Sequence, residues 1–163
     1  MKKSDSLKDR IYGREELNQE VIRLRLKSKT IAFTNGVFDI LHEGHIAVLS
    51  EAASFADVLI VGVNSDASVK KLKGEGRPVN QEDSRALIIA SLIMVDAVTI
   101  FNEETPLEII RLIQPDVLIK GGDYTLETMV GAKEVLDNGG RVEIIPILDG
   151  FSTTNIINKI SSK

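Results

Sequence analysis

Apolar runs alternate with amphipathic segments along most of the chain, which predicts strands and helices in turn. Short apolar runs that end in polar or glycine-containing turns are typical of strands buried in a parallel sheet. Five such runs occur, at residues 30–34, 57–63, 97–101, 117–119 and 142–145. The alternation predicts an α/β fold built on a doubly wound, parallel five-stranded sheet.

The segments between these runs carry the apolar spacing of helices. We expect helices opening near His45, near Ala67 and at Thr105-Pro106, and others over residues 81–92 (with Asn80 as N-cap), over 130–138 and after residues 150–155. Gly139-Gly140 is a typical end for the helix before it.

Residues 1–29 are expected to form an N-terminal tail and helix, and residues 30–163 the main domain. Residues 1–13 are polar and predicted to be frayed. Residues 15–29 place Leu17, Val21 and Leu24 on one helical face, with Ile22 at its edge. This helix packs against the edge of the domain, forms a dimer contact, or is the remnant of a linker; the pattern leaves these alternatives open.

Polar segments follow four of the five predicted strands. They are Thr34–His45, Asn64–Asp66, Lys120–Tyr124 and Ser152–Thr154. The carboxyl ends of parallel strands share one edge of a sheet, where α/β proteins bind their ligands. The sequence therefore predicts one pocket made from four distant segments.

Both histidines of the chain, His42 and His45, lie in the first of these segments. A strand, a tight turn and a helix N-terminus together offer main-chain N–H groups and a helix dipole to an anion. Two imidazoles three residues apart can reach one phosphate chain. Gly36 leaves room for a phosphate against the turn, and Asp39 is expected to fix the loop by accepting main-chain N–H groups.

The other segments offer further phosphate and sugar ligands. Lys70, Lys71 and Lys73 are read as a loop with Gly74 and Gly76, which is either a solvated charge run or a mobile phosphate clamp centred on Lys73. Arg77 and Arg85 are candidates for an acceptor's phosphate. Around Lys120, main-chain groups could read a base edge, and Asp123 could accept from a sugar hydroxyl. Ser152, Thr153 and Thr154 cap a helix or donate to phosphate.

The composition of the chain excludes several classes of function. The 163 residues, with 43% hydrophobic and 27% charged, suit one domain with a substantial core. No apolar run approaches the ~20 residues that span a bilayer, and the N-terminus lacks a secretory pattern, so we expect a cytoplasmic protein. The net charge of −4 argues against nonspecific binding of nucleic acid. The absence of Cys excludes disulfides and thiolate catalysis.

Several common sites are excluded by their missing motifs. There is no Gly-x-Gly-x-x-Gly after the first predicted strand, no P-loop, and no Gly-x-Ser-x-Gly turn. The sequence has no third histidine and no Glu-x-x-His pair, so it lacks the usual ligands of a zinc site.

Gly36-x-Phe38-Asp39-x-x-His42-x-Gly44-His45 resembles the signature of the HxGH nucleotidyltransferases, which have a Rossmann-like fold. Further segments follow in the order of one branch of that superfamily: Val63-Asn-Ser-Asp66, Leu72-Lys-Gly74, Arg77-Pro-Val-Asn80, Lys120-Gly-Gly-Asp-Tyr124 and Asp149-Gly-x-Ser-Thr-Thr-Asn-Ile-Ile157. Together they resemble the adenylyltransferases of bacterial ADP-heptose synthesis over roughly residues 15–160.

The resemblance implies a role for each matching residue. His42, His45 and Lys73 are expected to be catalytic. Nucleotide binding is expected from Thr34, Asn35, Gly36, Phe38, Gly44, Lys120, Gly121, Asp123, Tyr124, Ser152, Thr153 and Thr154, and acceptor binding from Asn64, Asp66, Arg77 and Arg85. No residue is expected to bind a metal directly.

The resemblance also implies the reaction: AMP passes from ATP to D-glycero-β-D-manno-heptose 1-phosphate, giving ADP-heptose and pyrophosphate for lipopolysaccharide core or another surface glycan. Mg²⁺ is expected to accompany ATP. The expected context is a homo-oligomer in the cytoplasm, without nucleic-acid or membrane partners. The chain resembles the stand-alone form, which works beside a separate sugar kinase.

Three alternatives stay open. A related enzyme could use ATP or CTP with another small phosphate such as glycerol 3-phosphate, although Leu148-Asp149 and Ile93-Met94 stand where the cytidylyl branch carries arginines. The sugar phosphate could be the D-α anomer, whose pathway normally uses GTP and a different enzyme family. The domain could also be a catalytically silent nucleotide-binding module.

Overall fold

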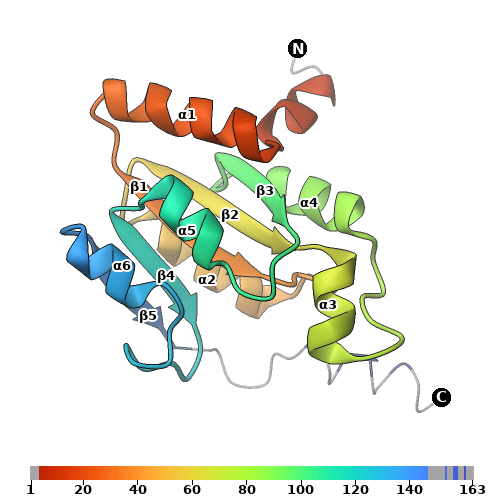
Figure 1. The fold of residues 1–163 in the computed structure, drawn as a ribbon. Helices are drawn as coiled ribbons and strands as arrows, with labels where there is room; N and C mark the ends of the chain where they lie inside the picture. The colour runs from red at the N-terminus through yellow and green to blue at the C-terminus, as the bar shows by residue number, and fades with distance from the viewer. Residues whose placement is uncertain (1–3, 147–152, 154–155, 158–159, 161–163) are drawn as a thin grey trace.

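The structure is a computed structural model that describes residues 4–146, 153, 156–157 and 160. Within these residues, five parallel strands form one sheet in the order β3-β2-β1-β4-β5 (Figure 1). The strands are β1 (Ile31–Gly36), β2 (Val58–Asn64), β3 (Ala97–Phe101), β4 (Val117–Gly121) and β5 (Arg141–Ile145). The predicted fold class is confirmed, and each strand lies where an apolar run predicted it.

The strand order changes direction beside β1. The chain builds outward from β1 through β2 to β3 and then crosses back to place β4 on the other side of β1. Phe33 pairs with Ile60 of β2 on one side and with Leu118 of β4 on the other. Successive connections therefore leave β1 and β4 in opposite directions, which opens a crevice at their carboxyl ends.

Helices cover both faces of the sheet (Figure 1). Among the described helices, α1 (Arg14–Leu26), α5 (Leu107–Ile113) and α6 (Ala132–Asp137) pack on one face, and α2 (Glu43–Ala53) and α4 (Glu82–Ala90) pack on the other. Ile31 and Phe33 of β1 enter the first core, whereas Ala32 enters the second, because neighbouring strand residues point to opposite faces. None of the described helices is both long and apolar enough to cross a bilayer.

Residues 4–13, which the sequence predicted to be frayed, pack against the sheet, so the prediction is wrong for these residues. A 3₁₀ helix, η1 (Ser4–Arg10), is followed by Ile11, which bridges to Val98 of β3. The Tyr12 N–H donates to the Val98 carbonyl at 2.8 Å, and Arg10 Nη1 donates to the Val95 carbonyl at 3.1 Å. Long-range hydrogen bonds, which local polarity does not reveal, hold this segment against the sheet.

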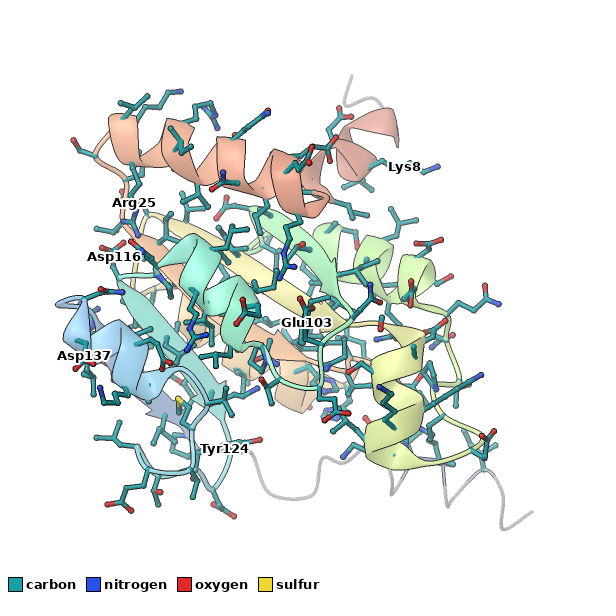
Figure 2. All side chains as sticks on the ribbon, viewed as in Figure 1. Lys8, Arg25, Glu103, Asp116, Tyr124 and Asp137 are labelled. Atoms are coloured by element: carbon teal, nitrogen blue, oxygen red, sulfur yellow. The ribbon has the colours of Figure 1, made fainter. Side chains whose placement is uncertain are left out.

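Helix α1 packs through the predicted stripe. Leu17, Val21 and Leu24 are buried in the same core as β1. At its end, Arg25 Nη1 contacts Asp116 Oδ2 at 2.5 Å, and the same oxygen accepts the Ile31 N–H at 2.6 Å (Figure 2). The ion pair thus joins α1 to the starts of β1 and β4, at the end of the sheet away from the crevice.

Three local predictions need correction. The lysines read as a loop belong to a helix, α3 (Asp66–Lys73), which Ser65 caps by accepting the Ser68 N–H and which ends at Gly74. The N-cap of α4 is Gln81 and not Asn80, because Asn80 is held by Asp39, as described below. The helix expected to open at Thr105-Pro106 begins at Leu107, with Pro106 as its N-cap.

Two glycines with positive φ allow a matched test of packing beside α6. Gly131 (φ +85°) would place a Cβ 2.4 Å from Ile110 Cδ1, whereas Gly139 (φ +81°) has no atom within 4 Å of that position. Gly139→Ala is expected to lower the free energy of unfolding by about 1 kcal/mol, the cost of a left-handed backbone. Gly131→Ala adds overpacking and should cost about 2–4 kcal/mol. Urea unfolding measures both, and equal losses would contradict the packing argument.

Candidate functional site

A cavity of about 710 Å³ opens at the carboxyl ends of the strands, in the crevice between β1 and β4. Most of the residues expected to bind ligand line it: Thr34, Asn35, Gly36, Phe38, His42, Gly44, His45, Asn64, Lys73, Arg77, Lys120, Gly121, Tyr124 and Thr153. Of the described candidates, Asp66, Arg85 and Asp123 do not line it. Ser152 and Thr154 lie outside the described residues.

The two histidines form a stacked pair at the start of α2. His42 is the N-cap and His45 lies in the first turn. Their ring centroids are 3.8 Å apart, with 25° between the planes, and the edge of Phe38 packs against His45 at 5.3 Å. Phe38 adopts φ +48°, and its ring comes so near Gly36 that a Cβ there would lie 3.0 Å away. A side chain at position 36 would therefore push the Phe38 ring from its place, so the close packing of Phe38 favours glycine there before any ligand is considered.

The hydrogen bonding of His45 determines which of its ring nitrogens carries the proton. Its Nδ1 accepts the main-chain N–H of His42 at 3.4 Å, and a ring nitrogen that accepts carries no proton. Burial, and then the neighbouring His42, lower the pKa of His45 to about 4. Burial also lowers the pKa of His42. At neutral pH both rings are therefore uncharged, and His45 presents an Nε2–H donor.

These pKa values predict that acid destabilises the protein. Below pH 6.5 the unfolded chain binds a proton at His45 that the folded protein excludes until about pH 4, so stability falls as the pH is lowered through this window. A shift of this size corresponds to at most about 3 kcal/mol, and solvent near the ring reduces it. We expect wild type to lose more unfolding free energy than His45→Gln between pH 6.5 and 4.5, measured by urea titration. Equal losses would contradict the assignment.

Lys120 brings a buried positive charge to the end of β4. Its Nζ donates to the main-chain oxygen of Asn35 at 3.0 Å and to Asn35 Oδ1 at 2.8 Å, and it lies 5.8 Å from the centre of the Tyr124 ring. Among the described residues no carboxylate forms an ion pair with Lys120. Burial lowers its pKa to about 8. A buried cation with only neutral partners is stabilised by a bound anion, so this position suits a phosphate.

Asp39 ties the turn after β1 to the segment before α4. Its carboxylate accepts Arg77 Nε at 2.7 Å and the main-chain N–H groups of Val79 and Asn80 at 2.8 and 2.9 Å, and its main-chain oxygen accepts Asn80 Nδ2 at 2.6 Å. Burial alone would raise the pKa of Asp39, but these hydrogen bonds hold it below its usual range. Asp39 does accept main-chain N–H groups as expected, although from a distant segment, and it orients Arg77 at the cavity wall.

Arg85 is a structural cross-link, which corrects the expectation that it binds the acceptor's phosphate. Its side chain is fully buried. It donates to the Val37 oxygen at 2.6 Å, the Asn80 oxygen at 2.9 Å and Asp66 Oδ1 at 2.8 Å. Asp66 is engaged by this pair, and its main-chain N–H donates to Glu82. Both residues therefore hold the rim together from outside the cavity.

The expected phosphate clamp is part of a helix. Lys73 is the last residue of α3, exposed and at the cavity lining, and Gly74 and Gly76 follow with φ of +87° and +85°. Lys71 instead faces Glu104, with 3.7 Å between Nζ and Oε1. Lys73 and Lys120 are the lysines among the described residues that line the cavity, and neither forms an ion pair with a described carboxylate.

Sequence reasoning missed the wall formed by Glu104, Thr105 and Pro106, which line the cavity from the connection between β3 and α5. This connection also follows a strand, so the rule used for the other four segments could have identified it. Val48, Leu72, Thr128 and Val130 line the cavity as well. Their apolar or neutral side chains gave no chemical signal in the sequence.

The geometry suits an elongated anion with uncharged parts. Two neutral imidazoles, a helix N-terminus, Lys73 and Lys120 can share several phosphate oxygens. The described residues contain no group of three or more His, Asp or Glu able to hold a metal ion.

Known proteins are similar to this chain in sequence and in fold. A family model described as cytidylyltransferase-like matches residues 33–163. The bifunctional protein HldE of Koribacter versatilis is 51% identical over 150 residues, which are 92% of this chain and 31% of the relative. The HldE of Nitrobacter winogradskyi is 54% identical over 144 residues, 88% of this chain and 30% of the relative. The chain spans about a third of the length of these curated relatives.

Two solved structures have a fold similar to that of this chain. A lipopolysaccharide core biosynthesis protein from Thermoplasma volcanium superposes with a TM-score of 0.59 at 30% identity, covering 74% of this chain and 97% of that one. The pantoate-beta-alanine ligase of Francisella tularensis gives 0.60 at 17% identity, covering 94% and 78%, and shows the shared fold alone. The family model covers the cavity lining and all of the sheet except Ile31 and Ala32, and so the chain belongs to the cytidylyltransferase-like family of nucleotidyltransferases.

Proposed function

We propose that the chain transfers AMP from ATP to D-glycero-β-D-manno-heptose 1-phosphate, releasing pyrophosphate and forming ADP-heptose. The observation that carries the proposal is the single cavity shared by the imidazole pair, Lys73, Lys120 and Thr153. The similarity to HldE over most of the chain, and to a protein named for lipopolysaccharide core biosynthesis, supports the choice of a sugar phosphate as acceptor.

The proposed chemistry needs no general base. A phosphate monoester has a second pKa near ~6, so the acceptor is largely a dianion at neutral pH. One of its oxygens attacks the α-phosphorus of ATP in line, and the bond from that phosphorus to the bridging oxygen of the β-phosphate breaks. Pyrophosphate leaves with the electron pair.

The protein's part is to hold these groups and stabilise the charge that develops. The His45 Nε2–H and His42 donate to the α-phosphoryl oxygens. Lys120 lies at the fixed wall of the cavity, and Lys73, on the exposed end of α3, reaches the leaving pyrophosphate. Thr153 Oγ1, which donates to the Ile40 oxygen at 3.4 Å, lies close to the turn that carries the histidines.

Mg²⁺ belongs to the proposal as the companion of ATP. It prefers phosphate, carboxylate and water oxygens, and the described residues offer no cluster of ligands that would hold it alone. ATP would therefore supply most of its ligands, and the metal would neutralise part of the phosphate charge. A homo-oligomer in the cytoplasm, which receives its sugar phosphate from a sugar kinase, completes the proposed context.

A substrate panel tests the function. Purified protein is given ATP or CTP together with heptose 1-phosphate (both anomers) or glycerol 3-phosphate, and pyrophosphate release is measured. We expect turnover with ATP and the β anomer of heptose 1-phosphate. A preference for CTP and glycerol 3-phosphate would make the protein a different nucleotidyltransferase. Tight ATP binding without turnover on any acceptor would indicate a silent binding module.

A further inference from the structure

The connection between β3 and α5 is a fixed wall of the cavity. Asn64 Nδ2 donates to Ser68 Oγ at 3.0 Å, and Ser68 Oγ donates to the main-chain oxygen of Glu103 at 3.2 Å. On the outer side, Arg14 pairs with the Glu103 carboxylate at 2.6 Å. The contact with Ser68 anchors the main chain next to Glu104, which lines the cavity. Its side chain is therefore presented from a rigid base.

Glu104 differs from the other carboxylate of the lining. The Asp39 side chain is 1% exposed and its oxygens are occupied by Arg77 and two main-chain N–H groups. The Glu104 side chain is 71% exposed, and its contact with Lys71 is a loose one at 3.7 Å. A carboxylate repels phosphate oxygens, so the part of the cavity beside Glu104 must receive a part of the ligand that carries no negative charge.

The strand order places this wall far from the base-binding side. Glu104 follows β3, the histidines follow β1, and Lys120 and Tyr124 follow or end β4, in a sheet ordered β3-β2-β1-β4-β5. Figure 2 shows the neighbouring Glu103 in the β3–α5 connection and Tyr124 beyond the end of β4, well apart. The β4 side adds Val48 and Val130 to the Tyr124 ring, a lining that suits a flat base. The reacting phosphates then lie in the middle.

We propose that Glu104 and Thr105 form the subsite that binds the hydroxyl groups of the acceptor sugar and so select a polyhydroxylated phosphate over a small one. This inference rests on the proposed function and names the residues that read the acceptor. A carboxylate accepts two hydrogen bonds from neighbouring hydroxyls, and the Thr105 hydroxyl can donate or accept. Neither residue touches the phosphates, so both govern acceptor affinity and not nucleotide affinity.

Steady-state kinetics test the subsite in the full chain. Glu104→Gln and Thr105→Val are expected to raise the KM for heptose 1-phosphate, by about tenfold or more for Glu104→Gln, and to leave the KM for ATP within about twofold. Glu103→Gln is the matched control, because its carboxylate pairs with Arg14 outside the cavity; it should change neither KM. A Glu104→Gln variant that alters the KM for ATP or the Mg²⁺ requirement but not the KM for heptose 1-phosphate would overturn the proposal.

Equilibrium binding separates this inference from the proposed reaction. In the presence of a non-hydrolysable ATP analogue, wild type should bind heptose 1-phosphate more tightly than inorganic phosphate, and Glu104→Gln should lose most of that difference. Equal affinity of wild type for the two ligands would overturn the subsite. Selective binding that depends on Glu104, without any turnover, would leave the subsite standing and reject the adenylyltransfer.

Discussion

His45→Asn is expected to lower kcat by about 10²–10³-fold, the loss typical of one donor to a developing phosphoryl or oxyanion charge. The His45 Nδ1 is occupied by the His42 N–H, so the Nε2–H is the donor available to ATP. Asparagine places its amide near the Nδ1 position and removes the Nε2 donor. The KM for ATP should change much less than kcat, because the lost contact strengthens in the transition state.

His45→Gln is the matched variant, because its longer side chain can place an amide N–H near the Nε2 position. We expect it to recover part of the activity that His45→Asn loses, with both variants folded as judged by thermal unfolding. Near-wild-type turnover in His45→Asn would remove His45 from the proposed mechanism. Equal activity of the two variants would show that the position of the donor does not matter.

Lys120→Met is expected to lower kcat/KM for ATP by about 10²-fold or more, while the ligand-free protein becomes no less stable. Within the part of the chain that the structure describes, the buried ammonium donates hydrogen bonds to the oxygens of Asn35, and its desolvation is offset when phosphate binds. Replacing a poorly compensated buried charge by an apolar side chain is often neutral or stabilising. Loss of function without loss of stability would separate a ligand-binding role from a structural one.

The same residue predicts a pH profile. Free Lys120 has a pKa lowered to about 8, and the neutral amine attracts phosphate less. Since kcat/KM reports the free enzyme, it should fall about tenfold per pH unit above that value. Lys120→Arg stays charged at alkaline pH and should abolish the decline, at the cost of a poorer fit. A profile in wild type that is flat to pH 10 would contradict the assignment.

The residues of the HxGH turn illustrate how far local pattern reaches. Their spacing along one strand, one turn and one helix determined that two imidazoles and a helix N-terminus share a small volume, and the structure brings them together in a stacked pair. Parallel strands then required the segments after β2 and β4 to reach the same rim. Lys120 and Tyr124 were identified in this way, Lys73 was identified from the glycines beside its basic run, and all three line the cavity.

Two arginines show where the local sequence pattern does not predict the role of a side chain. Arg77 and Arg85 looked equivalent in the sequence, yet Arg77 contacts Asp39 through its Nε at the cavity wall, whereas Arg85 is fully buried against three oxygens. The partners of Arg85 come from positions 37, 66 and 80. No local window contains them all, so the fate of such a side chain follows from packing between distant segments.

Alternating apolar blocks and the chemistry of one turn were enough, from the sequence by itself, to determine the parallel sheet and to predict the edge of the sheet at which a phosphate ligand would bind. The sheet and its binding edge follow from short-range geometry, namely the period of a strand or helix and the direction in which a parallel strand ends. The tertiary structure alone decided which cations remain available, which histidine tautomer faces the ligand, and that Glu104 stands in the cavity wall. Charge and protonation depend on burial and on partners brought from far along the chain, and only the folded arrangement supplies these.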